Sequence, residues 1–236
     1  MAFGQVLAAG TALSFTTALI YARHFHQILS KQVKHENIDA AGRRKACDLK
    51  ELETLPPELI TRTGEYRIVH DRDEKELHSA EVFECANADK LFTKLVQRDM
   101  TAFSSFPQAW MMRLLAKTTE QKASFSKDHV LSINYAEGDL FCGFYRVVKR
   151  DPFKVEIDME MPHTAGPLHG RLVISIVRTD DRALLRTETL QWATVASKAA
   201  LPLERAPIRF MHEVASWWLL VTGTAFLQSL SLENVA

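Results

Sequence analysis

The chain has 236 residues, and its 29 basic and 29 acidic side chains give a formal net charge of zero at pH 7. This length is enough for one large domain or two small ones with a buried core. The balanced charge offers no electrostatic footprint for nucleic acid, so we expect no nucleic-acid partner. Three cysteines without CxxC spacing indicate reduced thiols in a cytosolic compartment and not a disulfide framework.

Residues 1–22 contain no charged side chain, and Arg23 then begins a basic flank. An apolar span of about 20 residues is what a bilayer crossing requires, and basic residues tend to stay on the cytosolic side. We therefore predict an apolar helix over residues 1–33 that associates with a membrane, such as the endoplasmic reticulum, and leaves the remaining chain in the cytosol. Gln5 and several hydroxyl residues dilute the apolar character. The alternative is a helix packed on a soluble cytoplasmic domain.

Residues 34–63 are polar and include Pro56 and Pro57, which we expect to exclude a helix. This segment is interpreted as a linker or a strap over the surface. The main domain is then predicted over residues 64–236. It begins with a strand at 64–72 and a short apolar run at 79–86. Apolar residues at helical spacing follow and predict helices at 88–106 and 108–117.

From residue 129 the apolar period changes from helical spacing to alternation. Five strands are predicted in succession, at 129–136, 139–150, 153–161, 170–179 and 182–197. Short connections rich in Gly, Asp and Pro join most of them, which favours an antiparallel meander. Residues 205–233 are nearly free of charge and predict a long final helix. Strands held apart from helices indicate the α+β class, and a curved antiparallel sheet around one long helix is the helix-grip arrangement.

The strand at 153–161 alternates strictly between apolar and charged residues. We expect Val155, Ile157 and Met159 to face the long helix and a ligand pocket. The other side should lie in water, and it consists of Glu156, Asp158 and Glu160. A solid core is the alternative to a pocket, because an alternating pattern is compatible with both.

Four stretches carry a family resemblance: FPQAWMMRLLA, EGDLFCGFYRVVKRDPFKVEIDMEM, HGRLVISIV and LLRTETLQWATVA. Together they resemble the SRPBCC or START-like superfamily of helix-grip proteins over about residues 79–231, and Phe210-Met211-His212 matches a helical His motif loosely. Members of this superfamily include lipid carriers, hormone receptors, aromatase/cyclases and fungal natural-product cyclases. Some of the last are intramolecular Diels–Alderases of the norbornene-forming type. The uncharged first segment and the strap at 34–63 depart from the simpler members.

Signatures of nucleophilic, phosphoryl-transfer, nicotinamide and metal chemistry are absent from the sequence, so we expect no metal and no cofactor. On its strand Tyr145 shares a side with Phe141 and Val147, where its hydroxyl could donate to a substrate carbonyl; the alternative is a packed tyrosine at the rim. Arg186 and Glu188 are interpreted as a solvated pair. The neighbouring residues on the opposite side of that strand should then face inward as neutral hydrogen-bonding groups.

The resemblance and these patterns together imply a hydrophobic small-molecule substrate. The predicted catalytic residue is Tyr145, and the predicted substrate-binding residues are Phe106, Trp110, Met111, Val155, Ile157, Met159, His163, Thr187, Thr189, Gln191, Trp192 and Met211. The favoured function is a cofactor-independent cyclase, with Diels–Alder chemistry as the candidate, acting on a terpenoid or polyketide intermediate of secondary metabolism. The alternative is a non-catalytic carrier of a lipid or sterol-like ligand. A third reading is an assembly role at the membrane.

Overall fold

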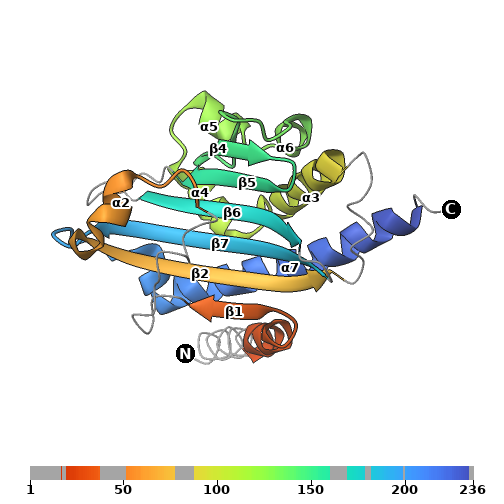
Figure 1. Ribbon diagram of the computed structural model, residues 1–236, viewed down its shortest axis with the longest axis horizontal. Coiled ribbons are helices and arrows are strands. Elements are labelled where there is room, and N and C mark those ends of the chain that lie inside the picture. The colour runs from red at the N-terminus through yellow and green to blue at the C-terminus, as the bar shows by residue number, and fades with distance from the viewer. Residues whose placement is uncertain are drawn as a thin grey trace, which may run out of the picture.

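The computed structural model describes residues 17, 20–37, 52–77, 88–159, 169–178, 182–198 and 200–233. These residues form an α+β fold around one seven-stranded sheet, seen face-on in Figure 1. Every strand pair in the sheet is antiparallel, as the short connections predict. The predicted α+β class is confirmed, and a sheet crossed by a long C-terminal helix is compatible with a helix-grip fold.

The strands follow the order β1-β2-β7-β6-β5-β4-β3 across the sheet. Their bounds are β1 Lys34–Asn37, β2 Tyr66–Leu77, β3 Leu140–Phe141, β4 Tyr145–Asp151, β5 Lys154–Met159, β6 His169–Arg178 and β7 Ala183–Thr194. The four strands from β4 to β7 form the predicted meander. Strand β2 then pairs with β7 over its whole length, from Tyr66 opposite Thr194 to Leu77 opposite Ala183. This long-range pairing joins the first part of the domain to the last strand.

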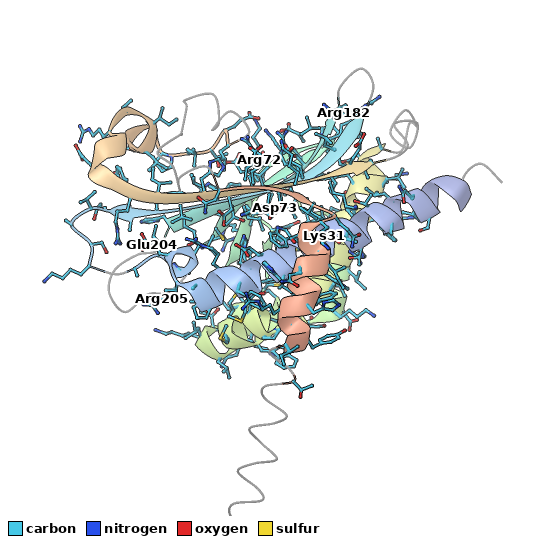
Figure 2. The ribbon with its side chains drawn as sticks, turned by 90° about the horizontal axis from the view of Figure 1, so that it is seen from below. Lys31, Arg72, Asp73, Arg182, Glu204 and Arg205 are labelled. Carbon is cyan, nitrogen blue, oxygen red and sulfur yellow. The ribbon has the colours of Figure 1, made fainter. Side chains whose placement is uncertain are left out.

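The helices lie on both sides of the sheet. They are a helix at 20–30, α2 Pro57–Thr61, α3 Ala88–Phe103, α4 Pro107–Leu115, α5 Thr119–Ala123, α6 Lys127–Ser132 and α7 Ala206–Glu233, with 3-10 turns η2 Thr63–Glu65 and η4 Pro202–Glu204. Figure 2 shows α7 and the helix at 20–30 on one side and α2 on the other. We call the α7 side the inner face of the sheet and the α2 side the outer face.

Three local predictions are wrong. The segment at 139–150 was expected to be one strand, but a turn at 142–144 divides it into β3 and β4, which pair with each other. The segment at 129–136 was expected to be a strand, but α6 occupies residues 127–132, because the Ser126 side chain caps its first turn by accepting from the backbone N–H of His129. Pro56 and Pro57 were expected to exclude a helix, but Pro57 is the first residue of α2. A proline is compatible with that position, since the first backbone N–H groups of a helix have no intrahelical acceptor.

The segment predicted as a strap at 34–63 contains regular structure at both of its described ends. Residues 34–37 are strand β1, which pairs with β2 at the edge of the sheet. Residues 52–61 run over the outer face, where Leu52, Leu55 and Leu59 pack against Leu190 and Trp192. This part of the segment therefore covers one face of the sheet and seals a small hydrophobic cluster.

The alternation in β5 gives its apolar side the expected direction. Val155 and Ile157 are fully buried on the inner face, within the main core that also includes Trp217 and Leu220 of α7. Met159 lies on the same side of the strand and is buried as well. The predicted inward direction of the three residues is confirmed, but Val155 and Ile157 are packed in the core and do not line a pocket.

The charged side of β5 does not lie in water. Glu156 is fully buried on the outer face, where its carboxylate accepts hydrogen bonds from the backbone N–H groups of Glu53 and Thr54 and from the Thr54 hydroxyl, at 2.9, 3.0 and 2.6 Å. Asp158 is half-buried and paired with Arg171. Glu160 lies outside the described residues. An alternating pattern separates the apolar side of a strand from its charged side. It does not show whether another segment of the chain covers the charged side.

We expect Glu156→Ala to lower the free energy of unfolding by about 1–3 kcal/mol, because it removes the buried carboxylate that accepts from two part-buried backbone N–H groups and one hydroxyl. Chemical denaturation checks this value. The matched control is Glu53→Ala, which removes an exposed carboxylate paired with Lys149 and Lys154 and should cost less than about 1 kcal/mol. If the two variants lose the same free energy of unfolding, the hydrogen bonds of the buried Glu156 carboxylate do not stabilise the fold more than an exposed ion pair does.

Most of the predicted membrane-associated segment, residues 1–16, 18 and 19, lies outside the described residues. Ile20 and Tyr21 begin the described part of the helix at 20–30 and are 65% and 70% exposed. In the part of the chain that the structure describes, no helix combines the length and the apolar character needed to span a membrane. Membrane association through residues 1–22 stays a prediction.

Candidate functional site

A cavity of about 320 Å³ lies between the inner face of the sheet and the helices α3, α4 and α7, with η4 at one end. Most of its wall is apolar. The apolar members are Met100, Phe103, Met111, Met112, Leu115, Met159, Leu172, Ile174, Leu185, Pro202, Leu203, Ile208, Ala215, Leu219 and Leu220. The polar members are Asp99, Gln108, Tyr145, Thr187, Thr189, Gln191, His212 and Ser216. A mostly apolar pocket with a few polar groups is typical of small-molecule sites.

Several predicted site residues come together in this cavity. They are Tyr145, Met111, Met159, Thr187, Thr189 and Gln191. The three β7 residues share the inner face because they alternate along the strand, opposite Asp73, Asp71 and Val69 of β2 in the same order. The predicted inward direction of Thr187, Thr189 and Gln191 is therefore confirmed.

The other predicted site residues lie elsewhere. Val155 and Ile157 belong to the sealed core next to the cavity. Phe106 and Met211 line a separate groove, between α4, α7 and the helix at 20–30. Trp110 is 61% exposed on the outside of α4. His163 lies outside the described residues.

Trp192 is also absent from the cavity wall. It faces the outer side of the sheet and packs with Leu52, Leu55 and Leu59. Residues of β7 alternate between the two faces, so the inward position of Gln191 requires Trp192 to point outward. Trp192 is therefore not brought together with the predicted site residues that line the cavity.

The ring of Tyr145 is held by two aromatic neighbours. It stacks on Phe141 with ring centroids 5.6 Å apart and meets Phe103 edge-on at 5.7 Å. Burial raises the pKa of Tyr145 well above its ordinary value, so the phenol stays protonated at neutral pH. No hydrogen bond to its hydroxyl comes from the residues that the structure describes. An oriented O–H donor without an internal partner is suited to a ligand oxygen.

Three polar groups of the wall are occupied by contacts within the protein. The Ser216 hydroxyl donates to Asp73 of β2 at 2.6 Å and shares a hydrogen bond of 3.0 Å with the Thr187 hydroxyl. The Gln191 side-chain oxygen accepts from the backbone N–H of Leu203 at 3.1 Å. These contacts fix α7 and η4 against the sheet. They leave Thr187 and Gln191 less available to a ligand than the sequence pattern suggested.

Thr189 and His212 make no side-chain hydrogen bond with the described part of the chain, although both line the cavity. Beside them lies Asp71, which faces Thr189 across β2 and β7. One oxygen of Asp71 accepts from Asn37 at 2.9 Å, and the other is buried with no hydrogen-bond partner in the described ranges. Burial raises the pKa of Asp71, and the nearby His212 opposes that rise. This end of the cavity can therefore hold a polar group of a ligand.

Asp99 places an ionisable group in the apolar wall. It is 4% exposed on α3, and its neighbour Arg98 donates to it at 2.5 Å. Burial is the larger influence, and it raises the pKa of Asp99 from an ordinary 3.8 to about 7 despite Arg98. A carboxyl group poised near neutral pH in a cavity is suited to proton exchange with a bound molecule.

The raised pKa of Asp99 has a consequence for stability. Between pH 3.8 and about 7 the folded protein keeps this proton while the unfolded chain releases it, so stability falls as the pH rises through that window. We expect Asp99→Asn to remove this part of the decline, with the variant gaining stability relative to the wild type from pH 5 to pH 8. Urea denaturation of both proteins at the two pH values measures the difference. If the difference in the free energy of unfolding between the two proteins is the same at pH 5 and pH 8, the pKa of Asp99 is not raised.

Sequence reasoning missed Asp99 and the α7 residues of the wall, although both leave a signal. His212, Ala215, Ser216, Leu219 and Leu220 recur at helical spacing and so mark one face of α7. Asp99 falls three residues after Val96 on the buried face of α3. A charged residue on the apolar face of a helix indicates a buried ionisable group, which is a candidate for a functional site.

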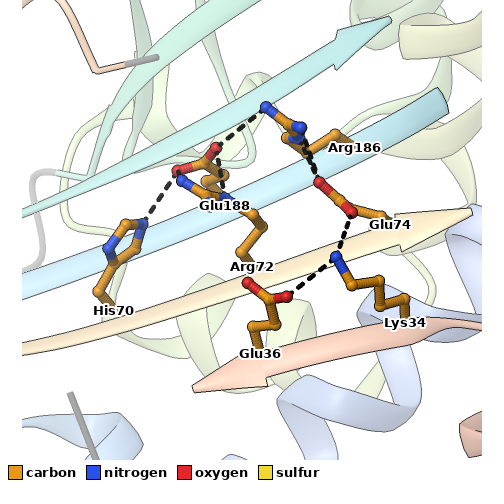
Figure 3. Close-up of polar contacts among 7 residues, drawn as sticks. All are labelled: Lys34, Glu36, His70, Arg72, Glu74, Arg186 and Glu188. Atoms are coloured by element: carbon orange, nitrogen blue, oxygen red, sulfur yellow. Dashed lines mark hydrogen bonds and ion pairs between the residues drawn. The ribbon is translucent and has the colours of Figure 1, made fainter. Parts of the chain in front are cut away.

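A second polar cluster lies on the outer face, away from the cavity. Glu188 of β7 is fully buried and accepts from His70 and Arg72 of β2, each at 3.0 Å (Figure 3). Burial alone would raise the pKa of Glu188, but the hydrogen bond from His70 and the charge of Arg72 lower it. Arg186 does pair with Glu188, at 3.9 Å, but the prediction that this pair is solvated is wrong, because Glu188 is fully buried.

The same network reaches the edge strand. Arg186 pairs with Glu74 at 2.7 Å, and Lys34 of β1 contacts Glu74 at 3.2 Å and Glu36 at 2.9 Å (Figure 3). Charges of opposite sign therefore alternate across β7, β2 and β1. We interpret this network as the contact that ties the three strands together.

Within the described ranges, no group of three or more His, Cys, Asp or Glu side chains is placed to hold a metal ion. Comparison with protein-family models, with curated proteins and with solved structures finds no match for this chain. The geometry of the cavity is therefore the basis for a functional proposal.

Proposed function

We propose that this protein binds a hydrophobic small molecule in the cavity and accelerates its cyclisation without a cofactor. The observation that carries the proposal is a largely apolar wall that also holds an oriented phenol, Tyr145, whose hydroxyl has no hydrogen-bond partner among the described residues. An apolar wall favours a terpenoid- or polyketide-like substrate over a sugar or a nucleotide. The resemblance to helix-grip cyclases supports the same reading, and the compatible architecture adds to that support.

Confinement is the first part of the proposed mechanism. A flexible chain loses rotational freedom when the cavity folds it, and this entropy is then no longer part of the barrier to ring closure. Cyclisations of the Diels–Alder type need no nucleophile. The described wall supplies rigid surfaces for such folding, because the strands β5, β6 and β7 and the helix α7 hold its apolar side chains.

Hydrogen bonding is the second part. Tyr145 would donate to a substrate carbonyl and stabilise the negative charge that grows on this oxygen in the transition state. Thr189 and His212 are further groups that could orient a polar end of the substrate. Asp99, with its pKa of about 7, could supply or accept a proton if the cyclisation passes through an enol.

The second candidate is a carrier that shields a lipid or sterol-like ligand. The predominance of apolar side chains in the wall favours it, since carriage requires burial of the ligand and no reactive group. The two functions share a binding step and differ in whether the ligand leaves unchanged.

The experiment that tests the proposal has two stages. Native mass spectrometry of the purified full chain first identifies any ligand that is retained, and Ala215→Phe, which fills the cavity from α7, should abolish that retention. Ala206→Phe is the matched control, because residue 206 is exposed at the start of the same helix. Incubation with a linear precursor then separates the functions: faster ring closure supports the cyclase, and unchanged release of a tightly bound ligand supports the carrier.

A further inference from the structure

Helix α4 exposes an apolar surface that no described residue covers. Its inward side is buried through Ala109 and Met112, but four neighbouring residues lie on its outward side, and we call them the α4 patch. The patch consists of Trp110, 61% exposed, Met111, 48%, Leu114, 87%, and Leu115, 48%. Large apolar side chains that gather on one exposed helix indicate a binding surface.

The α4 patch is continuous with the cavity. Met111 and Leu115 belong to the patch and also line the cavity, so α4 is at once the wall of the binding site and part of the molecular surface. The separate groove between α4, α7 and the helix at 20–30 adjoins the same helix through Phe106, Pro107 and Gln108. Gln108 lines the cavity as well.

The charges around the α4 patch favour one kind of partner. The sequence contains no acidic residue at 107–118 or at 20–33, whereas Arg113, Lys117 and Arg23 are exposed there. The helix at 20–30 lies beside α4 across the groove, and the uncharged segment 1–22 leads into it. Exposed Trp and Leu flanked by cations match the interface of a bilayer with anionic headgroups.

We propose that the α4 patch docks on the surface of an anionic lipid bilayer, with Trp110 and Leu114 inserted among the acyl chains. Arg113 and Lys117 then meet lipid phosphates at the edge of the patch. Docking in this way places the wall shared by Met111 and Leu115 against the membrane, so that an apolar ligand passes between bilayer and cavity without crossing water. The ligand route rests on the proposed function, but the docking itself does not.

The test measures binding of the full-length protein to vesicles of phosphatidylcholine with a minor fraction of phosphatidylserine. We expect Leu114→Glu to weaken binding at least about ten-fold, because a leucine that would insert among the acyl chains is replaced by a charge that anionic lipid repels. The matched control Val195→Glu changes an exposed apolar residue in the turn that follows β7, outside the α4 patch, and should bind as the wild type does. Ligand retention without vesicles should be the same in all three proteins, since Leu114 does not line the cavity.

A second measurement separates docking of α4 from anchoring by residues 1–22. Lipids with brominated acyl chains should quench the fluorescence of the wild type, and Trp110→Phe should lose most of that quenching while still binding. Vesicle binding without any Trp110-dependent quenching would overturn the proposal, as would a lack of vesicle binding. If Leu114→Glu instead removes a dimer in the absence of lipid, the patch is an interface between two copies and the proposal is also overturned.

Discussion

Replacing Tyr145 with phenylalanine is expected to slow turnover by roughly 10- to 1000-fold, the loss that follows when one donor to a developing oxyanion is removed. The ring would keep its contacts with Phe141 and Phe103, so the cavity should retain its shape and its ligand. The loss should therefore appear in kcat and leave KM nearly unchanged. Product formation from the linear precursor under saturating conditions measures it.

Tyr135→Phe is the matched control for this prediction. Tyr135 is also buried and packs on Phe141, but its hydroxyl donates to the backbone carbonyl of Val130 and does not line the cavity. Removing that hydroxyl should cost some stability and leave turnover unchanged. Equal rate losses in the two variants would show that packing, and not donation by Tyr145, sets the rate. Full activity of Tyr145→Phe would leave confinement as the sole effect of the cavity.

Ile157→Asp is expected to unfold the protein. Ile157 is fully buried in the main core between β5 and α7, among hydrophobic side chains. An unpaired carboxylate in such a place costs several kcal/mol, and the lost packing adds to this cost. The sum is comparable with the total stability of a typical domain, about 5–15 kcal/mol. Loss of the near-ultraviolet circular dichroism signal and of the cooperative thermal transition would record it.

Ile60→Asp makes the same chemical change in α2, where the side chain is 51% exposed. We expect it to alter the free energy of unfolding by less than about 0.5 kcal/mol, since the new carboxylate stays in water. A folded Ile157→Asp protein that still retains ligand would mean that the core between β5 and α7 tolerates charge, and it would contradict the described packing.

The sequence determined the elements whose pattern is local and strongly periodic. Alternation in β5, β6 and β7 predicted their strands and the inward direction of Thr187 and Thr189. Helical spacing predicted α3, α4 and α7. Both signals are properties of a short segment, because side chains repeat every two residues in a strand and about every 3.6 in a helix. The same rule placed Tyr145 on the inward side, although it assumed one continuous strand where the structure has β3 and β4.

The tertiary structure decided which surfaces meet, and a pattern along one segment does not contain this information. Glu156 alternates with apolar residues and Glu188 with threonines, as surface carboxylates do. Each is nevertheless fully buried, because distant segments supply its partners, residues 53–54 for Glu156 and β2 for Glu188. Trp192 packs under the segment at 52–59, while Asp99 reaches the cavity only because α3 lies against α7 and the sheet. A buried charge is stable only when its hydrogen-bond partners are brought to it, and long-range packing alone brings them.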